Sequence, residues 1–240
     1  MIVTKKNRVL GLTLARGGSK SVPRKNIKLL GRFPLISYTI KEALKSNFIT
    51  RYIVSTDDEE IQKVAIEFGA EAPFLRPVEF STDAASSVAA MRHAVEWVEN
   101  QEGVKYDYVV ELMCTNPMKS AEDIDGAIEK LIDTGADSVI AVHQLEDHHP
   151  ARIKKIVDDK IVDFCIQEIP ESRRQDLKPS AFIRSGSIYA LKRDHLMLDG
   201  KRYGSVNSRP IILPEERAIN IDTEIDFIFA ELMIREKNDN

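Results

Sequence analysis

A polar loop between residues 15 and 31 holds the side chains most capable of chemistry. Gly17 and Gly18 allow a tight turn that exposes backbone N–H groups. The loop also carries cations and hydroxyls, namely Arg16, Ser19, Lys20, Ser21, Arg24 and Lys25. Together these groups predict an anion cradle suited to a triphosphate. Composition alone is equally typical of a solvated basic turn, and the loop matches neither a Walker sequence nor Gly-x-Gly-x-x-Gly.

The loop follows a short apolar segment, residues 8–14, which reads as a buried strand. A helix is expected next over residues 34–44, with Pro34 in its first turn. The same patterns predict further strands at 52–55, 108–112, 138–142 and 187–191, and further helices at 59–68, 86–99, 121–132 and 222–234. This alternation predicts an α/β fold with a doubly wound, mostly parallel sheet. Such sheets bind ligands beyond the carboxyl ends of their strands, where the loop begins.

The alternation is interrupted in the second half of the chain. Residues 153–164 predict a hairpin that turns at residues 158–160, and a charged stretch follows at 167–178. We therefore expect one domain over residues 1–240, with an inserted arm at roughly 150–180.

Composition excludes several classes of protein. The net charge of −4 over 240 residues argues against a nucleic-acid binder. No apolar run is long enough to cross a membrane, and the N-terminal residues lack an apolar signal core. Cys114 and Cys165 lie far apart without neighbouring ligands, so neither a disulfide framework nor a zinc site is expected. A cytoplasmic protein fits these observations.

Residues 15–20, with Pro23 and residues 25–26, resemble the signature of the acylneuraminate cytidylyltransferases, the CMP-sialic acid synthetase family. Further matches follow in order along the chain: Arg76-Pro77, Thr115-Asn116-Pro117, His148-His149-Pro150, Gln175-Asp176-Leu177, Gly186-Ser187-Ile188-Tyr189 and Ile221-Asp222-Thr223. Each motif is weak alone, but their order and spacing are specific. The resemblance implies a nucleotide-diphospho-sugar transferase fold with a small dimerisation arm. It also implies transfer of CMP from CTP to the anomeric hydroxyl of an acidic nine-carbon sugar, with release of pyrophosphate.

The resemblance assigns roles on the nucleotide side. The catalytic residues would be Arg16, Lys25 and Asp222, and the nucleotide-binding residues would be Ala15, Arg16, Gly18, Ser19, Lys25, Asn26, Arg76 and Ser87. Fixed cations and backbone donors suit the charge that accumulates on phosphate oxygens. Arg76 and Ser87 match the family's cytosine-reading pair. Ser87 could instead cap the helix that begins there, with Ser86 as the competing cap.

The family's substrates carry a carboxylate, and the resemblance places basic groups for it at Arg152 and at Arg173 or Arg174. A partner subunit of a homodimer could supply them, and a solvated charge run is the alternative. The remaining implied sugar-binding residues are Met113, Thr115, Ser185 and Tyr189. Met113 and Ser185 stand where the family has Gln and Asn, which indicates altered sugar choice. A legionaminic- or pseudaminic-type sugar is then as plausible as a sialic acid.

The family holds Mg²⁺ with two aspartates spaced by one residue, and this chain has Asn220 and Asp222 at those places. One negative charge is missing, so weaker metal binding is expected. Asp222 could instead cap the last helix. Two other functions stay open: nucleotidyl transfer to another sugar acid or a sugar phosphate, and a catalytically silent homologue that binds nucleotide for regulation.

Overall fold

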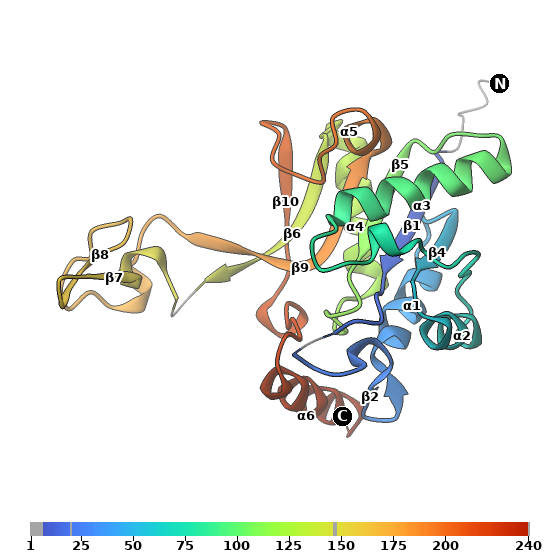
Figure 1. Cartoon of the computed structure of the whole chain (residues 1–240). Coiled ribbons are helices and arrows are strands. Elements are labelled where there is room, and N and C mark those ends of the chain that lie inside the picture. Colours follow the sequence, from blue (N-terminus) through green and yellow to red (C-terminus); the bar gives the residue numbers. More distant parts are fainter. Residues whose placement is uncertain (1–6, 20, 146–147, 240) are drawn as a thin grey trace.

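A six-stranded sheet forms the centre of the protein, which is described here by a computed structural model covering residues 7–19, 21–145 and 148–239 (Figure 1). The strand order is β10-β6-β9-β5-β1-β4. The strands are β1 (Val9–Leu14), β4 (Arg51–Ser55), β5 (Tyr108–Leu112), β6 (Ser138–Leu145), β9 (Ala181–Lys192) and β10 (Ser208–Ile212). Strand β9 runs antiparallel to β5 and β6, and the other pairs are parallel. The expectation of a mostly parallel sheet is confirmed.

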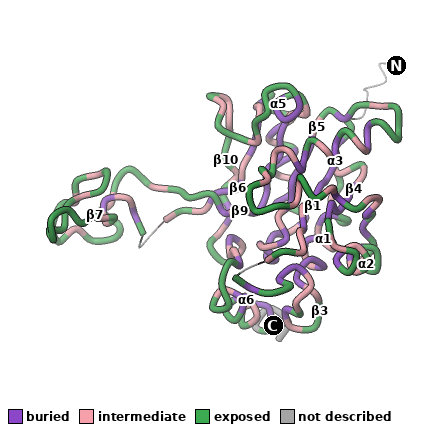
Figure 2. Tube along the Cα trace, viewed as in Figure 1, coloured by how far each residue is buried: buried purple, intermediate pink, exposed green. Residues whose placement is uncertain are grey.

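Helices cover both faces of this sheet. One face packs against α1 (Leu35–Lys45), α2 (Glu59–Glu67) and α4 (Ala121–Thr134), and the other against α3 (Ser87–Glu102) and α5 (Arg193–Met197). Successive residues of β1 serve the two faces, because Val9 joins the first core and Leu10 the second. Figure 2 shows this buried centre between the helices.

A third, smaller core lies beside the sheet. It joins α6 (Glu224–Asp239) to the segment that carries the two short strands β2 (Leu29–Leu30) and β3 (Phe33–Pro34). The structure describes side chains of α6 up to Arg235. The last helix begins at Glu224, two residues later than expected. None of the described helices is both long and apolar enough to cross a membrane.

The expected hairpin is present as β7 (Lys154–Val157) and β8 (Lys160–Asp163). Its turn places Asp158 and Asp159 at φ values of 49° and 59°, which short polar side chains tolerate best. The hairpin stands at the end of a ribbon made by β6 and β9 and extends away from the sheet (Figure 1). Figure 2 shows it exposed along most of its length.

Three neighbouring parallel strands, β4, β1 and β5, bring their carboxyl ends to one edge of the sheet. The segments that follow them therefore lie close together. These segments are the basic loop after β1, the turn at residues 56–58 after β4, and residues 113–118 after β5.

Candidate active site

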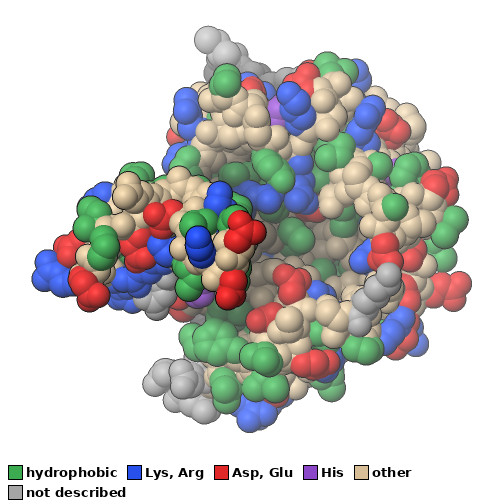
Figure 3. Space-filling view, turned by 60° about the vertical axis from the view of Figure 1, so that its left-hand side comes forward, with side chains coloured by type: hydrophobic (Ala, Val, Ile, Leu, Met, Phe, Trp, Pro, Cys, Tyr) green, Lys and Arg blue, Asp and Glu red, His purple; other side chains and the backbone are tan. Residues whose placement is uncertain are grey.

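A cavity of about 830 Å³ lies at this edge of the sheet. It is lined by the loop after β1, by the segment after β5, by β9 and by several other parts of the chain. The lining residues discussed below are Arg16, Ser19, Ser21, Lys25, Asn26, Arg76, Ser87, Glu111, Met113, Thr115, Arg184, Tyr189, Arg202, Asn220 and Asp222. Figure 3 shows the hollow beside the arm, with basic side chains gathered inside it. The cavity thus brings most of the predicted nucleotide-side residues together.

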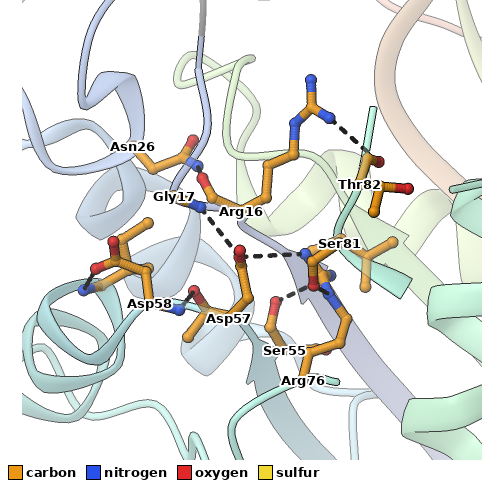
Figure 4. A network of polar contacts seen from close by, with 12 residues as sticks. Arg16, Gly17, Asn26, Ser55, Asp57, Asp58, Arg76, Ser81 and Thr82 are labelled. Carbon is orange, nitrogen blue, oxygen red and sulfur yellow. Dashed lines mark hydrogen bonds and ion pairs between the residues drawn. The ribbon is translucent and has the colours of Figure 1, made fainter. Parts of the chain in front are cut away.

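The loop after β1 is anchored from both sides. Asn26 Nδ2 donates to the Arg16 carbonyl at 2.9 Å, while Asn26 Oδ1 lies 3.0 Å from Cys114 Sγ after β5. On the other side, the Gly17 N–H donates to Asp57 Oδ1 at 3.1 Å (Figure 4). These bonds hold the loop's conformation before any ligand binds, which is the preorganisation that charge stabilisation requires.

Two cations of this loop line the cavity. Lys25 is buried, and its Nζ donates to the Ile221 carbonyl at 2.8 Å and lies 3.4 Å from Asp222 Oδ1. Arg16 is half-exposed and forms a 2.8 Å ion pair with Asp83. Both cations can contact an anionic ligand in the cavity. Among the described cations of the loop, Lys25 and Arg16 are therefore the ones that face the cavity.

The other members of the basic cluster differ. Arg24 does not line the cavity, because it pairs with Asp58 and Glu60 at the start of α2. The hydrogen bond from Arg24 lowers the pKa of Asp58. Lys20 lies outside the described residues, whereas Ser19 lines the cavity. Ala15 is buried behind the loop, and Gly18 is exposed beside the cavity and not among its lining residues.

Gly17 has a steric reason to be glycine. A Cβ atom there would lie 2.6 Å from Asp58 Oδ2 and 3.1 Å from Asp58 Cβ. We expect Gly17→Ala to push the loop away from α2 and to lower kcat/KM for CTP by about tenfold or more, because small misplacements at a reacting centre have large effects. Steady-state kinetics with varied CTP would measure this.

Gly18→Ala is the matched control, since a Cβ at Gly18 would meet no atom within 4 Å. It should cost clearly less activity than Gly17→Ala. Equal losses in both variants would show that the contact with Asp58 does not position the loop.

Another part of the cavity wall centres on Arg76, which is almost fully buried. Its Nε donates to Ser81 Oγ at 3.0 Å, one terminal nitrogen donates to the Ser55 carbonyl at 3.3 Å, and the other lies 3.8 Å from Asp57 (Figure 4). Burial lowers the pKa of Arg76. Arg76 therefore braces the loop through Asp57 as well as facing the cavity.

Ser86 performs the capping role that was weighed for Ser87. The Ala89 N–H donates to Ser86 Oγ at 3.1 Å, and α3 begins at Ser87. Ser87 lines the cavity and makes no side-chain hydrogen bond within the described structure. Its hydroxyl therefore remains available to a ligand.

Asn220 and Asp222 line the cavity next to Lys25. Asn220 Nδ2 donates to Asp222 Oδ2 at 2.6 Å, while Asn220 Oδ1 is buried and accepts no hydrogen bond from the described residues. Asp222 does not cap α6, because Thr223 Oγ1 accepts the Asp226 N–H at 3.2 Å and Asp226 accepts two N–H groups in return. An unsatisfied amide oxygen beside an exposed carboxylate fits a hard cation such as Mg²⁺.

Within the described part of the chain, no three His, Cys, Asp or Glu side chains are grouped to hold a metal ion. A metal at Asn220 and Asp222 would therefore depend on phosphate oxygens and water for its other ligands. Mg²⁺ usually binds proteins in this way.

Some of the predicted sugar-binding residues line the cavity and others do not. Met113, Thr115 and Tyr189 line the cavity, and Thr115 Oγ1 is buried with no hydrogen-bond partner among the described residues. Ser185 is not a lining residue, because its Oγ turns back to donate to the Ala141 carbonyl at 3.2 Å. Gly186 lines the cavity in its place. The expectation that the Ser185 side chain faces the sugar therefore does not match its position in this structure.

Arg152, Arg173 and Arg174 lie on the arm and do not line the cavity of their own chain. Arg152 donates to the Ser172 carbonyl at 3.4 Å, and Arg173 pairs with Asp176 at 2.8 Å. Any contact of these arginines with a sugar in the cavity would have to come from a second subunit. That role stays a prediction.

Several residues in the cavity wall or beside it were not identified from the sequence. Glu111, Arg184 and Arg202 line the cavity. Asp57 links the loop to Arg76, as described above. Only Glu111 gave a signal that could have been used, as a carboxylate within a buried apolar strand.

A further missed residue, Lys119, supports the segment after β5 from beneath. It is fully buried, and its Nζ donates to Thr39 Oγ1 at 2.7 Å, to the Met113 carbonyl at 2.8 Å and to the Asn116 carbonyl. Burial lowers the pKa of Lys119 to about 7. These bonds fix the backbone that presents Met113 and Thr115 to the cavity.

The sheet is mostly parallel, and the basic loop and the cavity lie at the carboxyl ends of its strands, which is where open α/β sheets bind ligands. The sequence model of the cytidylyltransferase family matches residues 10–203. The chain belongs to the cytidylyltransferase family.

Relatives extend over nearly the whole chain. A pseudaminic acid cytidylyltransferase of Campylobacter jejuni is 35% identical over 222 residues, covering 92% of this chain and 94% of the relative. A CMP-N,N'-diacetyllegionaminic acid synthase of the same species is 30% identical over 230 residues, covering 96% of each. A solved CMP:2-keto-3-deoxy-manno-octonic acid synthetase, complexed with CTP, shares the fold with a TM-score of 0.71 at 19% identity, covering 96% of this chain and 100% of the solved one.

Proposed function

We propose that this cytidylyltransferase joins CMP from CTP to the anomeric hydroxyl of an acidic, N-acylated nine-carbon sugar and releases pyrophosphate. The observation that carries the proposal is the cavity, in which Lys25 and Arg16 face the same space as Arg76 and Ser87. Its other end is lined by residues after β5 and along β9, which leaves room for a second substrate. The names of the relatives support a sugar acid of the pseudaminic or legionaminic type.

The reaction requires the sugar hydroxyl to approach the α-phosphorus opposite the departing pyrophosphate. The chain's residues contribute alignment and charge stabilisation, which supply most of the rate in phosphoryl transfer. Lys25 and Arg16 stabilise charge on phosphate oxygens, and the Asp57 and Asn26 contacts keep the loop in place. No side chain described in the cavity is assigned as general base.

Mg²⁺ is part of the proposal. Asp222 would hold it through its carboxylate and Asn220 through its unsatisfied amide oxygen. When bound, the ion supplies positive charge that helps to neutralise the leaving pyrophosphate.

We also propose a homodimer formed through the arm. Large apolar side chains of the arm are exposed, among them Ile156, Ile161, Phe164 and Ile169. A two-stranded hairpin is marginally stable alone, so a partner that covers these side chains would stabilise it. A second subunit could also bring Arg152, Arg173 and Arg174 to a neighbouring cavity. Sedimentation equilibrium should give twice the 27.1 kDa chain mass, and a monomer would contradict this part of the proposal.

A cytoplasmic location remains part of the proposal as well. Both cysteines are free, and Cys165 is exposed, which suits a reducing compartment.

A pyrophosphate-release assay tests the function. Purified protein would be incubated with Mg²⁺, each of CTP, UTP, ATP and GTP, and a panel of sugars. The panel contains pseudaminic acid, N,N'-diacetyllegionaminic acid, N-acetylneuraminic acid, an octulosonate and a sugar phosphate. We expect release only with CTP and a nine-carbon acid. Release with the octulosonate or the sugar phosphate instead would favour the alternative nucleotidyltransferases, and CTP binding without any release would indicate a silent homologue.

A further inference from the structure

A buried ion pair forms part of the wall on the sugar side of the cavity. Glu111 of β5 is fully buried, and Arg202 NH1 donates to its Oε2 at 2.6 Å. Tyr189 of β9 is the cross-strand partner of Glu111. The Arg202 guanidinium lies 4.0 Å from the centroid of the Tyr189 ring, so it is held by both residues of this strand pair.

This arrangement leaves Arg202 with unused donors. A guanidinium has five N–H groups. Among the described residues, Glu111 is the one that accepts a hydrogen bond from Arg202. Arg202 lines the cavity together with Glu111 and Tyr189. The remaining N–H groups can therefore bind a ligand without breaking the ion pair.

The charge of Arg202 is already balanced. Because Glu111 neutralises the guanidinium in a buried setting, a second full anion would gain little there, whereas a neutral oxygen acceptor gains a well-oriented hydrogen bond. Arg184 differs, since its guanidinium stacks 4.4 Å from the Tyr203 ring centroid and has no ion pair among the described residues. An anionic group of the substrate is better served by Arg184 than by Arg202.

We propose that Glu111, Arg202 and Tyr189 form a specificity subsite for an acylamino group of the sugar, with Arg202 donating to the amide oxygen. The inference rests on the proposed function and assigns the residues that choose the sugar. The ring of Tyr189 and the stem of Arg202 offer apolar surface for the acyl carbons. Glu111 and Arg202 are specificity and positioning residues in this proposal, because it gives them contacts with the sugar's acylamino group and none with the reacting phosphorus.

The test compares two nine-carbon 2-keto acids that differ at one group. N-acetylneuraminic acid has an acetamido group where its deaminated counterpart has a hydroxyl, and both would be assayed with CTP in the full-length protein. We expect the wild type to prefer the acetamido sugar in kcat/KM. We expect Arg202→Met to reduce that preference at least tenfold, while KM for CTP stays within about twofold.

Two further variants separate recognition from stability. Arg202→Met leaves a buried carboxylate unpaired, so the double variant Glu111→Gln with Arg202→Met is included to restore neutrality. It should show the same loss of preference. Arg193→Met is the matched control, because Arg193 and Glu99 form a comparable buried pair outside the cavity, with an Arg193 NH2 to Glu99 Oε2 distance of 2.7 Å. This control should lose stability and keep the sugar preference.

An unchanged preference in both Arg202 variants, or an equal loss in Arg193→Met, would overturn the inference. So would a wild type that uses neither of the two sugars or does not distinguish them. In those cases, turnover of another acidic nine-carbon sugar with CTP leaves the proposed function standing. Failure of every sugar in the panel overturns the function and the inference together.

Discussion

Lys25→Ala should lower kcat for pyrophosphate release by about 10²–10³, which is the loss typical of removing one preorganised charge-stabilising donor. Lys25 is buried at the end of the phosphate loop and is oriented by the Ile221 carbonyl and Asp222. Because these acceptors hold the ammonium in place before CTP binds, its charge needs no reorganisation during the reaction. The measurement is kcat at saturating CTP and sugar.

Lys63→Ala is the matched control, since Lys63 is an exposed lysine on α2. It should keep wild-type kcat. Thermal unfolding of both variants would show whether Lys25→Ala remains folded. If Lys25→Ala does not fold, the kinetic test would be repeated with Lys25→Met, which keeps most of the aliphatic stem of the lysine. A folded Lys25 variant with nearly normal kcat would refute the phosphate role.

Asp222→Asn should be the second most damaging substitution. It removes the carboxylate from the pair at positions 220 and 222 and leaves two amides, so the affinity for Mg²⁺ should fall sharply. We expect the Mg²⁺ concentration for half-maximal activity to rise at least tenfold, and kcat to fall by about 10² at ordinary Mg²⁺.

The reciprocal variant Asn220→Asp adds a carboxylate and should lower the Mg²⁺ requirement. The test is a titration of activity with Mg²⁺ for both variants and the wild type. If the three titrations coincide, the two residues do not hold the ion. Mg²⁺ binding measured by calorimetry in the presence of CTP provides a readout that does not depend on turnover.

The parallel part of the fold follows directly from the sequence. Strands β1, β4 and β5 are short apolar runs bounded by turns and helices, so periodicity identifies them. Strand β10 escaped prediction because it is an edge strand with Pro210 and the exposed Arg209 in its middle. The first residues of β9 lie in the exposed ribbon and not in the buried part of the sheet. For this reason only residues 187–191 show the apolar pattern of a buried strand.

The part of the cavity formed by the basic loop was predictable because its residues are contiguous. Arg16, Ser19, Lys25 and Asn26 lie within one loop, and the loop follows a recognisable strand. The structure adds what spacing cannot give: Arg24 is directed to Asp58, whereas Lys25, its neighbour, faces the cavity.

The sugar side was not predictable in the same way. Glu111 and Arg202 are separated by 91 residues and come from β5 and from the segment between α5 and β10, so only the folded chain brings them together. The Ser185 side chain donates to Ala141 of β6, at the irregularity where the pairing of β6 with β9 shifts register. Such contacts depend on the register of the sheet, which local sequence does not specify.

Calorimetric titration of nucleotides into the wild-type protein with Mg²⁺ tests the central claim most directly. The phosphate loop and the pocket around Arg76 and Ser87 predict saturable binding of one CTP per chain, at least tenfold tighter than UTP, ATP or GTP. Absence of CTP binding, or equal binding of all four nucleotides, would contradict the account.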